Sequence, residues 1–209
     1  MPRSPGAPTL VLVPTQREAA RLFDGAAPGF GLVELCGFGP LAAAARAAAS
    51  LERLRPRRVV LAGIAGTYDA ERLPVGAAAR FGSVALDGVG VGAGADLRGP
   101  AALGFPQWAG LDGRRAIGER LDLAGGGGLL LTVCAASDGA RVAAERRARF
   151  QGALAEDMEA FGVALACALA GVPLSVVRGA SNVAGERDHA AWRVDDALDA
   201  ARAALEEIL

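Results

Sequence analysis

Polar side chains that could carry out chemistry stand in four short segments of the chain. Among them are two carboxylates, Glu18 and Glu159, and one amide, Asn182. A carboxylate can draw a proton from water, and an amide can accept one hydrogen bond while it donates another. In an open α/β sheet, ligands bind at the carboxyl ends of the strands. We therefore expect the chemistry to lie in residues 15–18, 63–67, 157–159 and 181–188, each of which follows an expected strand or begins an expected helix.

Short runs rich in leucine and valine alternate with longer alanine-rich stretches along the 209 residues. This alternation is typical of a mostly parallel sheet with helices on its faces. The length suits one sizeable α/β domain, so we predict a single domain over residues 1–209. The expected strands are residues 10–13, 32–36, 59–62, 83–86, 129–133 and 174–177. The expected helices are residues 17–23, 40–54, 141–150, 158–170 and 194–208.

The stretch from residue 87 to residue 128 is rich in glycine and has no sustained period, so we interpret it as a flexible loop. A phosphate-binding P-loop ends in Gly-Lys-Ser/Thr, but this chain contains no lysine. No GxGxxG sequence opens a convincing helix, and a dinucleotide site is therefore not expected.

The balance of charges argues against a polyanionic partner. The chain has 22 basic and 23 acidic residues and a net charge of −1, so we expect it to bind neither nucleic acid nor an anionic membrane. The apolar run near the N-terminus covers only about five residues, which is too short for a signal peptide or a membrane span. We expect a cytoplasmic protein.

Cysteine and histidine are too sparse for a typical metal centre. Cys36, Cys134 and Cys167 lie in apolar segments without CxxC spacing, and His189 is the only histidine. Cysteines of this kind are more often reduced core residues than metal ligands. We therefore expect no metal and no dissociable cofactor.

Three motifs carry a resemblance to a known family. GIAG at residues 63–66, EDMEAFG at 156–162 and VVRGASN at 176–182 resemble, in this order, the nucleoside phosphorylase and nucleosidase superfamily. Nearly the whole chain can be laid along that pattern. The resemblance implies a three-layer α/β/α sandwich with a mixed, mostly parallel central sheet. Within the superfamily, the extension NVAGERD at 182–188 with Trp192 resembles the futalosine hydrolases.

The resemblance implies roles for the two glutamates. Glu18 would be the general base that activates a water molecule, while Glu159 would bind the ribose hydroxyls and Met158 would lie against the sugar. Negative charge beside the sugar favours a developing oxocarbenium ion. Structural interpretations remain open, because Thr15 and Glu18 have the spacing of a helix capping box and Glu159 could complement the dipole of the expected helix.

Asn182 bears on the choice of the purine base. The resembling enzymes that cleave methylthioadenosine carry an aspartate here, which can deliver a proton to N7 of adenine. The oxygen of Asn182 could instead accept from an N7 proton while its NH₂ group donates to a carbonyl at C6. This pairing suits hypoxanthine and rejects a 6-amino group. The alternative is an ordinary turn asparagine after a strand.

Other pocket residues follow from the resemblance alone. The backbone of Ala65 and Gly66 would line the pocket, and Ser137 would belong to its base end.

Arg187, Asp188 and Trp192 complete the motif. Their default interpretation is a structural ion pair with a packing tryptophan. A sharper hypothesis places Trp192 as a wall near the 5′ substituent of the substrate.

Water is the expected nucleophile. The phosphorylases of the superfamily hold phosphate with a Gly-Asp-Pro-x-Arg stretch after the first strand and with an arginine before the glycine motif. Here these places read Val-Pro-Thr-Gln-Arg at residues 13–17 and Leu-Ala at residues 61–62. Without paired arginines, little would neutralise a phosphate. Ile64 also departs from the pattern, because the nucleosidases usually carry a small hydroxyl residue there.

The resemblance thus predicts hydrolysis of futalosine to hypoxanthine and dehypoxanthine futalosine, a step of menaquinone biosynthesis. The alternatives are a methylthioadenosine or S-adenosylhomocysteine nucleosidase, a purine nucleoside phosphorylase, and a non-catalytic purine-binding or storage protein. A homodimer or higher homo-oligomer is implied by the family. Residues 87–128 are short where a flap over the site would be expected.

Overall fold

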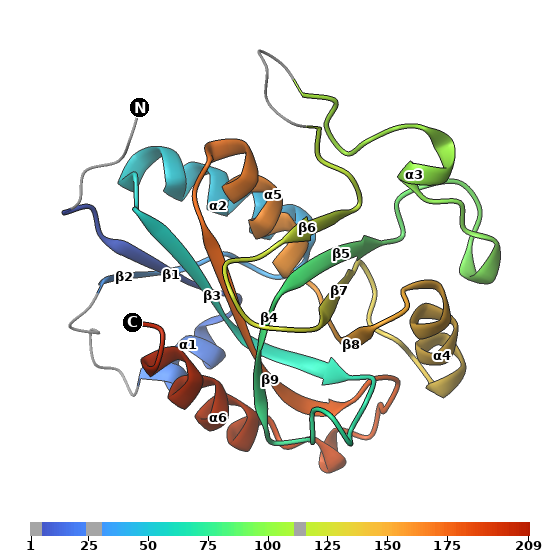
Figure 1. Ribbon diagram of the computed structural model, residues 1–209. Coiled ribbons are helices and arrows are strands. Elements are labelled where there is room, and N and C mark those ends of the chain that lie inside the picture. The colour runs from blue at the N-terminus through green and yellow to red at the C-terminus, as the bar shows by residue number, and fades with distance from the viewer. Residues whose placement is uncertain (1–5, 24–30, 111–115) are drawn as a thin grey trace.

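One mixed β-sheet organises residues 6–23, 31–110 and 116–209, which are the residues that the computed structural model describes (Figure 1). Within these ranges the sheet has nine strands. They are β1 (Thr9–Val13), β2 (Gly31–Leu35), β3 (Arg58–Thr67), β4 (Ala78–Phe81), β5 (Ser83–Asp87), β6 (Arg120–Asp122), β7 (Leu129–Val133), β8 (Ala153–Asp157) and β9 (Leu174–Val183).

Most strand pairs are parallel. β1 lies between β2 and β3, β3 pairs with β9, and β7 lies between β5 and β8, all in parallel. Antiparallel pairing joins β4 to β9, β6 to β5, and the last two residues of β3 to β8. The carboxyl ends of β1, β3 and β9 therefore meet near the end of β8, where parallel sheets bind ligands.

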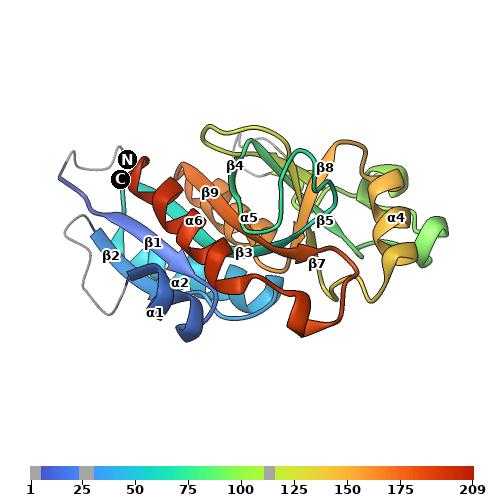
Figure 2. The same cartoon turned by 90° about the horizontal axis from the view of Figure 1, so that it is seen from below.

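Helices cover both faces of the sheet. They are α1 (Gln16–Phe23), α2 (Pro40–Leu54), α3 (Pro100–Leu103), α4 (Ala140–Arg149), α5 (Ala160–Ala170) and α6 (Val194–Glu206). The helices α2 and α5 pack together on one face, and α1 and α6 cover the other (Figures 1 and 2). In the described ranges no helix is both long and apolar enough to cross a bilayer.

Strand β1 shows why the buried runs are continuously apolar. Leu10 and Leu12 join the core beneath α2 and α5, while Val11 and Val13 join the core beneath α6. Successive side chains of a strand point to opposite faces, so a strand covered on both faces needs an apolar residue at every position. The α/β sandwich with a mixed, mostly parallel sheet that the sequence predicts is confirmed.

The expected elements agree with the structure in type, with a few differences in extent. All six expected strands and five expected helices are present, but β3 and β9 are ten residues long and run on through the motifs that we expected to be loops. Strands β4, β6 and β8 were not expected. The helix expected to begin at Met158 begins at Ala160, because residues up to Asp157 still belong to β8.

The glycine-rich stretch from residue 87 to residue 128 is partly regular in its described residues. It contains a 3₁₀ turn at Gly94–Asp96, the short helix α3 and the edge strand β6. Residues 111–115 of this stretch lie outside the described residues.

Candidate active site

A cavity of about 720 Å³ opens at the carboxyl ends of β1, β3 and β9 and beside the end of β8. All four chemistry-bearing segments of the sequence contribute to its wall. Of the residues predicted for the site, seven line this cavity: Glu18, Ala65, Gly66, Met158, Glu159, Asn182 and Trp192. A hollow of similar size, about 750 Å³, lies between β6 and the end of α5, but its charged lining residues, among them Arg120 and Asp122, are largely exposed.

Glu18 is buried at the start of α1 and turned toward β3. Its Oε1 accepts a hydrogen bond from the backbone N–H of Ile64 at 3.2 Å, and its Oε2 accepts one from the hydroxyl of Thr15 at 2.6 Å. The backbone N–H of Glu18 donates to Thr15 Oγ1 at 3.3 Å, which is one half of a capping box. The carboxylate itself is held at the cavity. This hydrogen bond comes from the backbone N–H of Ile64, so it does not depend on the small hydroxyl side chain that the nucleosidases usually carry at this position.

Arg178 is a central residue of the site to which the sequence had assigned no role. It is fully buried in β9 and donates to Asp157 Oδ2 from Nε at 3.1 Å and from Nη2 at 2.5 Å. Nη2 also donates to Glu159 Oε2 at 3.2 Å. Burial lowers the pKa of Arg178, but the attraction of Asp157, Glu159 and Glu18 outweighs burial and raises it above the usual value. The guanidinium is therefore permanently charged.

The remaining nitrogen of Arg178, Nη1, is buried and has no hydrogen-bond partner among the described residues. Gly63 separates it from Glu18. A Cβ atom added to Gly63 would lie 2.3 Å from Nη1 and 2.7 Å from Glu18 Oε1. Only a glycine therefore allows the base candidate and the unpaired donor to face the same small space.

Glu159 lies at the first turn of α5, in the N-cap position, and is buried. Its Oε1 accepts from the N–H of Gly39 at 3.1 Å and its Oε2 from Arg178. Burial, with the repulsion of Asp157 and Glu18, raises the pKa of Glu159 to about 7, against the opposing attraction of Arg178 and the Gly39 hydrogen bond. The carboxyl group can thus change its charge near neutral pH.

Asp157 fixes the start of α5 and orients Arg178. Its Oδ2 accepts from the N–H of Ala160 at 2.9 Å, and its Oδ1 accepts from the hydroxyl of Thr132 at 2.7 Å. The same hydroxyl oxygen accepts from the N–H of Phe161 at 2.8 Å. The sequence marks Asp157 only as part of a motif, and its hydrogen bonds show that it is a structural anion.

A bulge in the β3–β9 pairing places Asn182 in the cavity wall. Ala65 pairs with Ala180, but Gly66 pairs with Asn182, so Ser181 is the extra residue. Bulges re-aim side chains next to active sites. The amide Oδ1 accepts from Ser181 Oγ at 2.8 Å, and Nδ2 donates to the carbonyl of Val183 at 2.9 Å. One lone pair of the oxygen and one hydrogen of the NH₂ group remain for a ligand.

Trp192 lines the outer part of the cavity. Its indole N–H donates to the carbonyl of Glu186 at 3.2 Å, and the Arg187 guanidinium lies 5.3 Å from the centre of its ring. The expected ion pair of Arg187 with Asp188 is not found between these two described residues. Asp188 instead accepts from the N–H of Ala190 at 3.0 Å and caps a 3₁₀ turn, because the carboxylate is the nearest acceptor for that turn. Arg187 stays available at the rim.

Ser137 lies behind the cavity wall. It is 1% exposed, and both its N–H and its hydroxyl are bound to Glu156, while its neighbour Ala136 lines the cavity. None of the described residues between 87 and 128 lines the cavity. Among the described residues no cluster of three or more histidine, cysteine or acidic side chains is placed to hold a metal ion.

Residues 32–209 match the family model of the phosphorylase superfamily. The chain belongs to this superfamily. It is 36% identical over 193 residues to a futalosine hydrolase of Thermus thermophilus, which covers 87% of this chain and 82% of that protein. It is 51% identical over 73 residues to a futalosine hydrolase of Streptomyces coelicolor, and this match covers 35% of the chain and only 31% of the relative.

Solved structures of the superfamily share the fold. The futalosine hydrolase of Helicobacter pylori superposes with a TM-score of 0.77 at 14% identity over 98% of both chains. A 5′-methylthioadenosine/S-adenosylhomocysteine nucleosidase of Neisseria meningitidis in complex with methylthio-immucillin-A superposes with a TM-score of 0.74 at 18% identity, over 97% of this chain and 98% of that one. At these identities the likeness shows the fold alone.

Proposed function

We propose that this member of the phosphorylase superfamily hydrolyses the N-glycosidic bond of futalosine and releases hypoxanthine and dehypoxanthine futalosine. The observation that carries the proposal is the meeting of Glu18, Glu159 and Asn182 in one cavity. The names of the relatives from Thermus thermophilus and Streptomyces coelicolor support the choice of futalosine.

Glu18 is the proposed general base. The attacking water would lie in the cavity beside the Glu18 carboxylate and donate a hydrogen bond to it. The water oxygen forms a bond to C1′ of the ribose and its proton passes to Glu18, which later returns it to solvent. The C1′–N9 bond breaks with its electron pair moving onto the purine, which takes up one proton at N7 from solvent. A positioned base of this kind contributes roughly 10²–10⁴-fold to a rate.

Glu159 is the proposed partner of the ribose. Its carboxylate, held by Gly39 and Arg178, would accept from the ribose hydroxyls and stabilise the positive charge that develops on the sugar. Met158, which also lines the cavity, would lie against the sugar ring. Because this charge exists mainly in the transition state, the interaction favours that state over bound substrate.

Asn182 is the proposed contact of the leaving base. The free lone pair of Oδ1 would accept from N7–H of hypoxanthine, and the free hydrogen of Nδ2 would donate to its C6 carbonyl. With adenine, the second contact would bring two donors together. The amide therefore favours a 6-oxopurine.

Phosphate is a less suitable nucleophile in this cavity than water. Arg178, the only arginine in contact with both Asp157 and Glu159 among the described residues, already has its charge balanced by these carboxylates. Arg17, Arg187 and Arg193 also line the cavity, but six acidic side chains line it with them, so a doubly charged phosphate beside Glu18 and Glu159 would find no surplus of positive charge.

The deciding experiment measures base release by the purified protein from futalosine, aminofutalosine, inosine and methylthioadenosine, with and without phosphate, beside Glu18→Gln. Hypoxanthine release from futalosine that does not depend on phosphate and falls at least roughly 10²-fold in Glu18→Gln is expected. Glu52→Gln, an exposed glutamate of α2, is the matched control. Adenine release would contradict the assignment of Asn182, and tight nucleoside binding without turnover would favour a binding protein.

The proposal includes a homo-oligomer. Phe38, which lines the cavity, is 69% exposed, and Leu41 nearby in α2 is 86% exposed. A second copy of the chain would cover such apolar side chains. Sedimentation equilibrium should give a mass of twice the monomer or more, and a monomer at micromolar concentration would contradict this part.

A further inference from the structure

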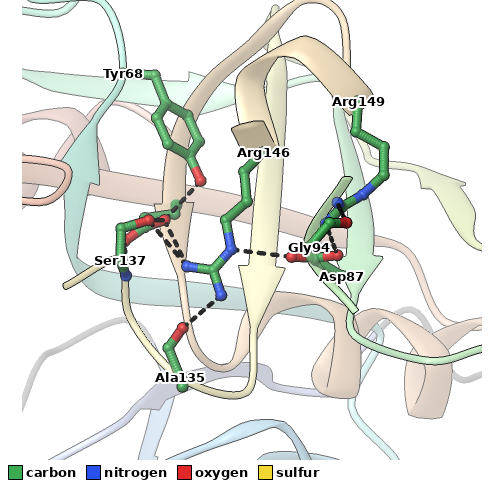
Figure 3. Close-up of polar contacts among 8 residues, drawn as sticks. Tyr68, Asp87, Gly94, Ala135, Ser137, Arg146 and Arg149 are labelled. Carbon is green, nitrogen blue, oxygen red and sulfur yellow. Dashed lines mark hydrogen bonds and ion pairs between the residues drawn. The ribbon is translucent and has the colours of Figure 1, made fainter. Parts of the chain in front are cut away.

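A second buried polar cluster adjoins the cavity, whose lining includes Glu156, and has no part in the proposed chemistry (Figure 3). At its centre is Glu156, one residue before the structural anion Asp157. Glu156 accepts from the N–H of Ser137 at 2.8 Å, from its hydroxyl at 2.7 Å and from the hydroxyl of Tyr68 at 2.6 Å. Burial and the neighbouring Glu156 raise the pKa of Tyr68 above its usual value, so the phenol stays a donor.

Arg146 of α4 completes the cluster and holds the loop between β7 and α4. Nη2 donates to the carbonyl of Ala135 at 2.8 Å, and Nη1 donates to the hydroxyl of Ser137 at 2.9 Å and lies 3.4 Å from Glu156 Oε2. Nε donates to Asp87 Oδ2 at 2.9 Å (Figure 3). One guanidinium therefore fixes the loop on both sides of Ala136, and Ala136 faces the cavity.

The charges of this cluster balance. Glu156 and Asp87 are the two acids, and Arg146 and Arg149, which also binds Asp87, are the two bases. Buried ion pairs contribute little to stability compared with apolar residues of the same size, while their geometry is strict. Such a cluster is better suited to fixing a backbone in place than to stabilising the fold.

The held loop touches the turn that follows β9, the strand that carries Asn182. Gly185 packs so closely that a Cβ on it would lie 2.6 Å from the carbonyl carbon of Gly139 and 3.0 Å from the nitrogen of Ala140. Ala184 and Val133 belong to the same buried cluster on that side. The loop at residues 134–139 therefore adjoins the turn at residues 184–185, so a shift in the loop would move this turn and the end of β9 with it.

We infer that Arg146 and Glu156 are positioning residues that set the selectivity of the cavity for a 6-oxopurine over a 6-aminopurine. They act by holding Ala136 and the adjoining end of β9, which carries Asn182, in the arrangement that fits hypoxanthine. This inference rests on the proposed function, since it assigns the base end of the cavity to Asn182. Discrimination by hydrogen bonds requires that both partners stay in place, and a displacement of about 1 Å can cost 10²-fold in rate.

The test compares Arg146→Met, Arg146→Lys and Glu156→Gln with the wild type on futalosine and aminofutalosine, which differ at C6 of the purine. Arg141→Met is the control, because Arg141 lies on the exposed face of the same helix and pairs only with Glu145. We expect Arg146→Met to lower the ratio of kcat/KM for the two substrates roughly tenfold, mainly through KM, with kcat within about threefold and an unchanged pH profile. Arg146→Lys should recover part of the ratio.

Calorimetric binding of free hypoxanthine and adenine gives a second measure that does not need turnover. If the wild type binds hypoxanthine more tightly than adenine and Arg146→Met loses that preference, the inference holds even if the protein turns out not to be a hydrolase. An unchanged preference in folded Arg146→Met and Glu156→Gln, with only a lower Tm, would reduce the cluster to a structural role and overturn the inference. A wild type that binds neither purine overturns it as well.

Discussion

Gly63 and Glu18 lie so close that a methyl group on the Gly63 Cα would stand 2.7 Å from Oε1 of the carboxylate. The same methyl group would stand 2.3 Å from Nη1 of Arg178, and both side chains are held in place by other hydrogen bonds. Gly63→Ala should therefore push the Glu18 carboxylate out of its place at the cavity and away from the water that it activates. We expect kcat to fall roughly 10²-fold, with KM changed much less, in steady-state assays of hypoxanthine release.

Gly118→Ala is the control for this change, because nothing lies within 4 Å of the corresponding Cβ and no left-handed φ is required there. If both variants keep full activity, the position of the Glu18 carboxylate beside Gly63 does not matter for catalysis, and Glu18 is not the general base.

The pKa of Glu159 predicts the acid side of the pH profile. Burial raises this pKa to about 7, and the ionised form is the one that stabilises the oxocarbenium ion. Activity should therefore be lost as the pH falls through about 7, by a factor approaching ten for each further unit, in kcat/KM measured between pH 5 and 9. A profile that stays flat from pH 5 to pH 8 would contradict the proposed role.

The same carboxyl group should make the fold less stable as the pH rises. Its folded pKa of about 7 lies above the usual value of 4.5 for a glutamate, so between these values the folded chain binds more protons than the unfolded chain. The free energy of unfolding then decreases from pH 4.5 to pH 7 through this group. Glu159→Gln removes this effect. The free energy of unfolding of the variant, relative to that of the wild type, should therefore rise by up to roughly 3 kcal/mol between pH 4.5 and pH 8.

Urea unfolding at these two pH values, with Glu206→Gln as an exposed control on α6, measures the gain. If the difference in the free energy of unfolding between variant and wild type is the same at both pH values, Glu159 is not the group that titrates between them.

Asn182→Asp should change the base that is released. An aspartic acid at this position can donate a proton to N7 of adenine, and it no longer offers an N–H to a C6 carbonyl. We expect hypoxanthine release to fall by one to two orders of magnitude while adenine release from aminofutalosine rises relative to it, because a site built for a hydrogen bond discriminates by about this much. Chromatography of the released bases provides the ratio. An unaltered ratio would leave Asn182 with a structural role only; the turn position that the sequence allowed is already excluded, because Asn182 lies in β9.

Trp192→Ala tests the outer wall of the cavity. The indole and the Arg187 guanidinium stacked on it lie at the rim, where a long 5′ substituent would leave the cavity. The variant should lose roughly tenfold or more in kcat/KM with futalosine and change little with inosine, which lacks that substituent. Trp108→Ala, beside the other hollow, is the control. Equal losses on both substrates would reject a specific role for Trp192.

The fold could be predicted from the sequence where burial leaves a simple pattern. β1 and β7 consist mostly of apolar residues and were predicted. β8 was not predicted, because two of its five residues, Glu156 and Asp157, are acidic and acidic residues are uncommon in buried strands. Their carboxylates are buried only because donors from distant segments meet them. β3 was expected to end before Gly63, since glycine disfavours strands, but the close approach of Arg178 requires a glycine inside the strand.

Site residues could be predicted from the sequence where their chemical type alone indicates a role. Glu18, Glu159 and Asn182 could be proposed because carboxylates and amides have few chemical uses at strand ends. Arg178 could not be assigned a role, because its importance comes from contacts with Asp157, Glu159 and Gly63, which lie far from it in sequence. The position of Ser137 behind the wall likewise depends on Glu156, whose burial the sequence did not reveal.

The two glutamates are each anchored by a backbone N–H from a remote part of the chain. Ile64 holds Glu18 across 46 residues, and Gly39 holds Glu159 across 120 residues. Contacts of such long range form late, since the entropy of closing the chain must be overcome first. During refolding, activity should therefore return only with the last cooperative phase, well after helical circular dichroism has recovered. A partly folded chain should have no catalytic activity.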